Sequence, residues 1–266
     1  MTPRPDPEDR PAADGASRRP GVGGVPMPDS PAPVEPGQAP DAPAVAAEVF
    51  GSQLALAEAY AHLLSVTGVT HGLIGPREIV RLWDRHILNC AVIAPAFPQG
   101  ARVIDVGSGA GLPGLVLAIV RPDLHLTLIE PMQRRTDWLQ TAVARLGLEQ
   151  VEVRRGRAEQ LAGQEYAPWV TARAVAEIGK LAGWALPLLD EGGTLVAMKG
   201  RSAAEELAAA GPALRRLGRV EGEVRTWGAG VLESPTSTIN LTLHERAASR
   251  ESRSRSPRRQ RRSPRR

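Results

Sequence analysis

Apolar positions along the chain follow two different periods, and the change of period divides the sequence into segments. From about residue 45 to residue 64 apolar side chains recur every three to four positions, which predicts a helix. Residues 77–93 repeat this spacing, and Pro95 and Pro98 end it. Residues 1–44 show no regular apolar period. The pattern therefore predicts a helical region that begins near residue 45.

After residue 100, short apolar runs alternate with helical stretches. Seven runs are typical of strands: residues 101–106, 124–130, 151–154, 169–174, 193–199, 220–227 and 238–244. Helical spacing is present in residues 114–120, 133–146, 177–186 and 203–217. Strands that alternate with helices indicate βαβ units and a mostly parallel sheet. No helix separates the last two strands, so we expect them to pair as an antiparallel edge hairpin.

Composition separates two terminal extensions from this region. Residues 1–44 contain 12 of the 24 prolines, and residues 247–266 contain nine arginines and one glutamate. Neither segment has enough apolar surface to offset the entropy of ordering, so both are predicted to be disordered. We therefore divide residues 45–246 into a helical cap, 45–98, and an α/β core, 99–246, with one extension at either end.

The charge is also unevenly distributed. Residues 1–49 carry a net charge of −4, residues 50–246 carry none, and residues 247–266 carry +8. The isoelectric point of 9.9 thus arises from the tail. The tail is a candidate for binding polyanions without sequence preference, and a solubilising extension is an equally good interpretation.

Several classes of protein are excluded. The chain has one cysteine, Cys90, so neither a disulfide framework nor a cysteine-based zinc site forms within one chain. The longest apolar run, residues 115–120, is too short to span a membrane. Residues 1–6 lack the apolar stretch of a secretory signal. We expect a cytoplasmic protein with neither a metal nor a membrane contact.

The most informative motif follows the first predicted strand. Residues 105–114 read Asp-Val-Gly-Ser-Gly-Ala-Gly-Leu-Pro-Gly and open a helix. Glycine permits a tight turn and the close approach of a ligand to the backbone. In an open α/β sheet, ligands bind outside the carboxyl ends of the strands. The motif therefore predicts a cofactor site at this turn.

Two classes of cofactor use such a layout. Residues 109–114 satisfy G-x-G-x-x-G, and Glu130 lies 21 residues after Gly109, as a nicotinamide dinucleotide site requires. The pattern D/E-x-G-x-G-x-G, typical of S-adenosylmethionine sites, is satisfied by Asp105, Gly107, Gly109 and Gly111. Asp105 favours the second class, because a carboxylate attracts an ammonium group and repels a pyrophosphate. The helical cap and the antiparallel pair also favour it. In either class we expect Glu130 to accept both ribose hydroxyls.

The chain from about Tyr60 to Glu245 resembles the bacterial ribosomal RNA small subunit methyltransferase G family, also called glucose-inhibited division protein B. The matching pieces are residues 85–89, 105–114, 121–123, Glu130 with 134–135, 157–159, 172–175 and 199–200. The resemblance implies a Rossmann-like class I fold. It also implies methyl transfer from S-adenosylmethionine to N7 of a guanosine in 16S ribosomal RNA. A small molecule or a protein remains the alternative acceptor, because a fold does not fix its substrate.

The resemblance also implies roles for individual residues. It implies cofactor contacts at Gly107, Leu112, Ala158, Glu159 and Arg173. Two positions depart from the family pattern, since Glu130 and Asn89 stand where relatives carry aspartate. The extra methylene of Glu130 is still expected to reach the ribose, whereas the departure at Asn89 removes any role for a carboxylate there.

Other candidates have a structural interpretation beside the functional one. His86, Arg173 and Lys199 are candidates for positioning the reactants, although a histidine in a helix is also typical of core packing. Arg134, Arg135, Lys199 and Arg201 are candidates for RNA binding, or are solvated surface charges. The tryptophans at positions 83, 138, 169 and 184 are expected in the core.

We predict no catalytic base, because guanine N7 carries an unprotonated lone pair at neutral pH and alignment suffices. The expected partner is 16S ribosomal RNA or the small ribosomal subunit, and the expected state is a monomer.

Overall fold

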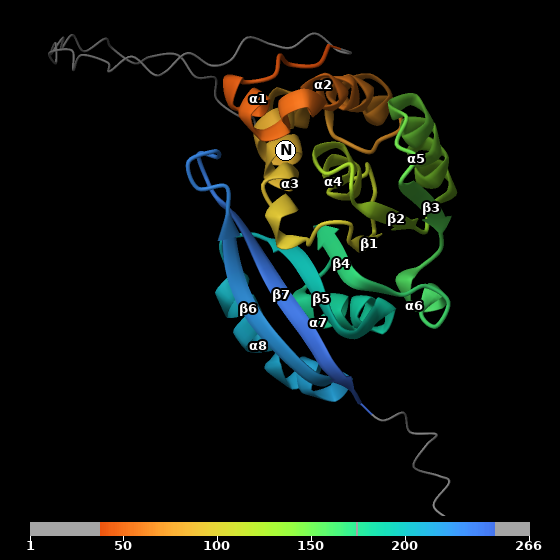
Figure 1. The fold of residues 1–266 in the computed structure, drawn as a ribbon, viewed down its shortest axis with the longest axis vertical. Helices are drawn as coiled ribbons and strands as arrows, with labels where there is room; N and C mark the ends of the chain where they lie inside the picture. Colours follow the sequence, from red (N-terminus) through yellow and green to blue (C-terminus); the bar gives the residue numbers. More distant parts are fainter. Residues whose placement is uncertain (1–37, 174, 248–266) are drawn as a thin grey trace, which may run out of the picture. The chain divides into compact units, whose positions relative to one another are not determined.

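A computed structural model describes residues 38–173 and 175–247. The disorder predicted for residues 1–44 and 247–266 concerns segments that lie almost entirely outside this range. The strands are β1 (Arg102–Val106), β2 (His125–Glu130), β3 (Val151–Arg155), β4 (Ala167–Arg173), β5 (Leu189–Lys199), β6 (Gly218–Trp227) and β7 (Thr236–Arg246). All seven form one sheet (Figure 1).

The order of the strands, β3-β2-β1-β4-β5-β7-β6, confirms the predicted doubly wound sheet. The five strands β1 to β5 are parallel, and β7 is antiparallel to both β5 and β6. The expected antiparallel hairpin is therefore present, with β6 at the edge. The chain changes direction across the sheet between β1 and β4, and the carboxyl ends of strands beside such a reversal leave room for a ligand.

Helical segments flank the sheet. The α-helices are α1 (Ala44–Phe50), α2 (Leu54–Leu63), α3 (Asn89–Ala91), α4 (Gly114–Val120), α5 (Gln133–Leu146), α6 (Ala158–Leu161), α7 (Ile178–Ala185) and α8 (Ala203–Leu217). Short 3-10 segments are η1 (Gly51–Gln53), η3 (Pro76–Arg81), η5 (Ala94–Ala96) and η6 (Leu186–Leu188), and π-helical segments are η2 (Leu64–Gly68) and η4 (Leu82–Leu88). Within the part of the chain that the structure describes, no helix has the length and apolarity to span a bilayer.

Two apolar cores cover the two faces of the sheet. Successive residues of a strand point to opposite faces, so Val103 packs with α1, α2, α4 and α5 while its neighbour Ile104 packs with α7 and α8. Figure 1 shows these two groups of helices on opposite sides of the strands. The continuous apolar runs of β1 and β2 follow from burial on both faces.

The prediction of one continuous helix over residues 77–93 is wrong. The structure divides it into η3, η4 and α3, with a 3-10 winding, a π-helical winding and a short α-helical turn. The apolar residues Leu82, Ile87 and Leu88 are all buried in this segment. The wider winding of η4 changes which side chains share a face, and it brings His86 against the end of β4.

Candidate functional site

The glycine motif forms a turn between β1 and α4 that only glycine adopts without strain. Gly107, Gly109 and Gly111 have φ angles of 72°, 57° and 88°. A Cβ atom on Gly111 would lie 2.4 Å from Leu115 Cδ1. The backbone N–H groups of Gly107 and Ser108 donate to the carbonyl oxygen of Ile129 at 2.9 and 3.1 Å. These bonds tie the turn to the carboxyl end of β2.

Asp105 lies behind this turn. Its side chain has no exposed surface, and its Oδ2 accepts a hydrogen bond from the Gly114 N–H at 3.1 Å. Oδ1 has no hydrogen-bond partner among the described residues. Burial raises the pKa of this carboxyl to about 7. Asp105 thus supports the first turn of α4, and its predicted contact with a cationic ligand stays a prediction.

Glu130 ends β2 and faces the turn. Its two carboxylate oxygens accept hydrogen bonds from the backbone N–H groups of Gly109 and Met132, each at 3.0 Å. Arg135 Nη1 lies 3.8 Å from the same carboxylate, whose side chain is 2% exposed. A carboxylate offers about four lone pairs, so acceptor capacity remains for two hydroxyl groups. The backbone thus fixes the orientation of Glu130.

A cavity of about 170 Å³ opens beside the turn at the carboxyl ends of the strands. It is lined by Val106, Gly107, Ile129, Pro131, Gly156, Arg157, Ala158, Glu159, Val175 and Trp184. Three predicted cofactor residues, Gly107, Ala158 and Glu159, meet in its wall. The walls combine apolar side chains with one carboxylate, Glu159, and one guanidinium, Arg157. An apolar wall with one carboxylate acceptor suits a flat nucleoside base with an amino group.

Some predicted and observed positions differ at this cavity. Trp184 packs against the core, as its apolar spacing predicted, and it is half-buried because it also lines the cavity, which the spacing did not indicate. The Nζ atom of Lys180 lies 5.1 Å from the centroid of the Trp184 ring. A lysine four residues before a tryptophan on a helix is the sequence signal that could have placed this ring at the surface of the core. Val175 was missed as well. Leu112 packs against the core on the other face of the sheet and does not line the cavity.

Arg173, at the end of β4, contacts the helical cap. Its Nη2 donates to the Arg85 carbonyl oxygen at 3.0 Å and to His86 Nδ1 at 2.8 Å. Its Nη1 lies 3.2 Å from the sulfur of Cys90. Two predicted positioning candidates, His86 and Arg173, are therefore brought into direct contact. Tyr60 donates to the Ala110 carbonyl oxygen at 2.7 Å and connects the cap to the glycine turn.

The structure divides the predicted RNA-binding residues into two kinds. Lys199 Nζ donates to the Ala176 carbonyl oxygen at 2.5 Å and to Glu206 Oε1 at 2.7 Å, and its side chain is 10% exposed. Arg135 faces Glu130. Arg134 and Arg201 are exposed. The first two cations therefore stabilise the site from within, and the other two face solvent.

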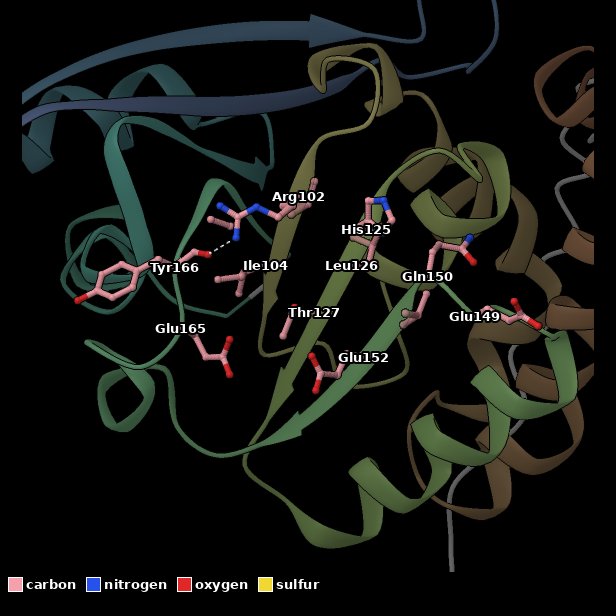
Figure 2. Close-up of a pocket in the computed structure, with 13 residues that line it drawn as sticks. Arg102, Ile104, His125, Leu126, Thr127, Glu149, Gln150, Glu152, Glu165 and Tyr166 are labelled. Atoms are coloured by element: carbon pink, nitrogen blue, oxygen red, sulfur yellow. Dashed lines mark hydrogen bonds between the residues drawn. The ribbon is translucent and has the colours of Figure 1, made fainter.

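A larger cavity, of about 360 Å³, lies at the opposite, amino ends of β1 to β4 (Figure 2). Figure 2 shows Arg102 hydrogen-bonded to the backbone carbonyl of Tyr166, with Glu152 and Glu165 near Thr127. Two of the cavity's three carboxylates have a basic partner, since Arg154 pairs with Glu152 and with Glu165 at 3.1 Å each. The sequence pattern predicts no site here.

A comparison with solved structures agrees with the fold. A protein of Methanococcus maripaludis whose name assigns it to the S-adenosyl-L-methionine-dependent methyltransferases superimposes with a TM-score of 0.50 at 12% identity. The match covers 68% of this chain and 92% of that one. At this identity the likeness shows the fold alone.

Sequence relatives are more informative. A ribosomal RNA small subunit methyltransferase G of Pseudarthrobacter chlorophenolicus is 54% identical over 75% of this chain and 93% of its own length. A protein of the same name from Salinispora tropica is 54% identical over 76% of this chain and 86% of its own. The family model of rRNA small subunit methyltransferase G matches residues 53–230. The chain therefore belongs to the rRNA small subunit methyltransferase G family.

Proposed function

We propose that the protein transfers a methyl group from S-adenosylmethionine to N7 of a guanosine in 16S ribosomal RNA. The observation that carries the proposal is the glycine turn with positive φ angles, held between the carboxyl groups of Asp105 and Glu130, in a chain of this family. The family assignment also favours S-adenosylmethionine over the nicotinamide dinucleotide that the same glycines permit.

The residues present fit this cofactor. Glu130, oriented by two backbone N–H groups, accepts from the ribose hydroxyls. Ala158, Glu159 and Trp184 enclose the adenine, with Glu159 as the acceptor for its amino group. Gly107 lets the ligand approach the backbone, because a side chain there would fill the same space. Arg173 is the cation for the methionine carboxylate.

The bound cofactor supplies an activated methyl group on a sulfonium. The chain's own part is to hold the acceptor nitrogen in line with that group, which is the entropic contribution of a positioned bimolecular reaction. Guanine N7 presents a lone pair at neutral pH, so no residue needs to remove a proton from it. His86 and Arg173 therefore act in positioning, not in acid–base catalysis.

RNA binding has to come from local clusters of positive charge, since residues 50–246 have no net charge. Arg134, at the start of α5, and Arg201, after β5, are exposed near the carboxyl end of the sheet. We assign them to phosphate contacts. Lys199 and Arg135 act indirectly, by fixing the loops that carry the exposed arginines.

We further propose a monomer in the cytoplasm, with an arginine-rich tail that adds non-specific affinity for RNA.

Methyl transfer into small ribosomal subunits tests the proposal. Subunits from a strain that lacks this gene are incubated with the protein and tritiated S-adenosylmethionine. We expect label in the RNA that is released by strand cleavage specific for N7-methylguanine. A parallel reaction on naked 16S RNA shows which of the two is the substrate. Label in a protein fraction or in small molecules would show that the acceptor is not RNA. Absence of label while the cofactor binds would refute the RNA reaction.

A further inference from the structure

A chain of polar contacts connects the helical cap to the end of β4. His86 Nε2 lies 2.9 Å from Glu78 Oε2, and His86 Nδ1 lies 2.8 Å from Arg173 Nη2. The three residues come from η3, η4 and β4. The His86 side chain is 11% exposed and the Glu78 side chain 34%, so the contacts are shielded from solvent on the side of His86. Glu78 is not part of the glycine turn or of the cavity wall.

The two partners of His86 determine its tautomer. Arginine has five N–H donors and no acceptor, and a guanidinium is always protonated. His86 Nδ1 must therefore carry a lone pair in order to accept from Arg173. An ionised carboxylate is an acceptor only, so Nε2 must carry the proton that is donated to Glu78. The geometry requires a neutral imidazole with its hydrogen on Nε2.

These contacts fix the position of Arg173 but do not occupy all of its N–H donors. It donates once to the Arg85 carbonyl, once to His86 and once to the Cys90 sulfur. Two of its five N–H groups are then without a partner among the residues that the structure describes. A guanidinium held on one side and open on the other is preorganised for an anionic ligand.

We propose that Glu78 is a positioning residue for the methyl-transfer reaction: by fixing the Nε2–H tautomer of His86, it holds Arg173 ready for the cofactor's carboxylate. The inference rests on the proposed function only for the identity of that anion. The arrangement resembles the way in which outer carboxylates orient histidine ligands at metal sites, where their loss costs affinity at a distance.

The charges around His86 agree with a neutral ring. Burial lowers the pKa of His86 and the adjacent Arg173 lowers it further, while the hydrogen bond with Glu78 opposes them. Arg85, on the same segment, also disfavours the imidazolium. The hydrogen bond from His86 lowers the pKa of Glu78. At neutral pH the pair is therefore carboxylate and neutral imidazole, and acidification places a second N–H against the Arg173 guanidinium.

Nitrogen NMR of the imidazole rings tests this assignment directly. The chain has five histidines, so selective 15N-histidine labelling gives few signals, and the spectrum of His86→Asn identifies the signal of His86. We expect the Nε2–H tautomer at pH 7.5. An imidazolium or an Nδ1–H tautomer would overturn the proposal, because neither accepts from Arg173. This readout does not require that the protein methylate RNA.

Binding of S-adenosylmethionine by calorimetry tests the consequence. Glu78→Leu removes the acceptor for Nε2–H, and we expect loss of the tautomer preference and on the order of tenfold weaker binding. Glu78→Gln keeps a carbonyl acceptor at the same place, so it should retain the tautomer and recover most of the affinity. Asp84→Asn removes a charge from the neighbouring exposed position and serves as the matched control.

The outcomes separate the two proposals. Unchanged tautomer and affinity in Glu78→Leu would refute the role of Glu78, even if the wild type methylates RNA. The expected NMR result in a protein that binds another anionic ligand and transfers no methyl group would refute the proposed function. It would leave intact the part of the inference by which Glu78 fixes His86 and so holds Arg173 for an anion. Equal loss of affinity in Glu78→Gln and Glu78→Leu would show that only the negative charge of Glu78 matters, and would overturn its role as the hydrogen-bond acceptor that fixes the tautomer of His86.

Discussion

Two of the cavities in the described part of the chain lie at opposite ends of the same parallel strands, and the smaller of this pair has the features of a binding site. The cavity at the amino ends has a volume of about 360 Å³, against about 170 Å³ at the carboxyl ends. At the amino ends, Glu152 and Glu165 already pair with Arg154. At the carboxyl ends, Glu130 is oriented by backbone N–H groups and Asp105 keeps an unpartnered oxygen within the described residues.

The difference shows that the direction of the strands and the residues of the loops indicate a binding site better than the volume of a cavity does. Loops after parallel strands converge at the carboxyl ends, and there they bring glycine turns and helix starts together. Three substitutions and one deletion test this difference between the two ends. Where the chain allows it, each substitution at the carboxyl ends has a control substitution at the amino ends.

The largest effect concerns stability and pH. Burial raises the pKa of Asp105 from 3.8 to about 7, so the folded state holds a proton that the unfolded chain releases. The free energy of unfolding should therefore fall as the pH rises from about 4 to about 7, by on the order of 4 kcal/mol. In Asp105→Asn this fall should disappear. Urea unfolding between pH 4 and 8 measures it.

At the amino ends, Glu152→Gln provides the control. Its side chain is 56% exposed, and we expect the pH dependence of the wild type to persist. A wild-type stability that does not change between pH 4 and 7 would contradict the buried, protonated Asp105.

The second effect is on cofactor affinity. Glu130→Gln removes the charge that accepts from the ribose hydroxyls, and we expect about 100-fold weaker binding of S-adenosylmethionine. Glu165→Gln, which alters a carboxylate at the amino-end cavity, should leave the affinity unchanged. Calorimetry on both variants, after circular dichroism has confirmed folding, compares the two ends. A loss of similar size in both would remove the distinction.

The third effect compares two glycines with similar backbone angles at the two ends of β1. Gly107 has φ 72° and Gly100 has φ 68°, so alanine at either position should cost about 1 kcal/mol of stability. A Cβ atom on Gly107 would lie 3.1 Å from Val175 Cγ2, in the cavity wall, whereas none of its neighbours approaches within 4 Å at Gly100. We expect about tenfold weaker cofactor binding only in Gly107→Ala. Equal affinities of the two variants would argue against a cofactor at this turn.

The smallest effect concerns the arginine tail. The strand that precedes the tail, β7, ends at the amino side of the sheet, where Arg246 Nη1 donates to the Leu186 carbonyl oxygen at 3.1 Å. Deletion of residues 247–266 should reduce the slope of log affinity for RNA against log salt concentration, and leave cofactor affinity unchanged. Filter binding at several salt concentrations measures the slope. An unchanged slope would exclude the tail as an RNA contact.

Local sequence was sufficient for the strands and the glycine turn. The apolar runs of β1 and β2 and the glycines at 107, 109 and 111 have conformational requirements that few other residues satisfy. The broken helix over residues 77–93 was not predictable, because its apolar spacing fits an α-helix as well as the observed mixture of windings. The four-residue helix α6 is too short to show a period.

Contacts between distant residues were out of reach of the sequence pattern. Arg173 and His86 are 87 residues apart, and neither position indicates that the two side chains meet. Arg135 and Glu130 are only five residues apart, but they lie on α5 and β2, so no helical spacing relates them. Trp184 packs against the core as its apolar spacing predicted, and that spacing does not indicate that it also lines the cavity. Spacing predicted which residues lie near the site, and only the packing of the cap against β4 decides which of them are paired.

Amide hydrogen exchange with and without S-adenosylmethionine is the most direct test of the central claim, that the cofactor binds at the carboxyl ends of the strands. The account predicts slower exchange in residues 107–112, 130–132 and 156–159 when the cofactor is present. It predicts no change in residues 149–152 and 165–167, which line the larger cavity. Protection confined to the amino-end segments, or equal at both ends, would contradict it.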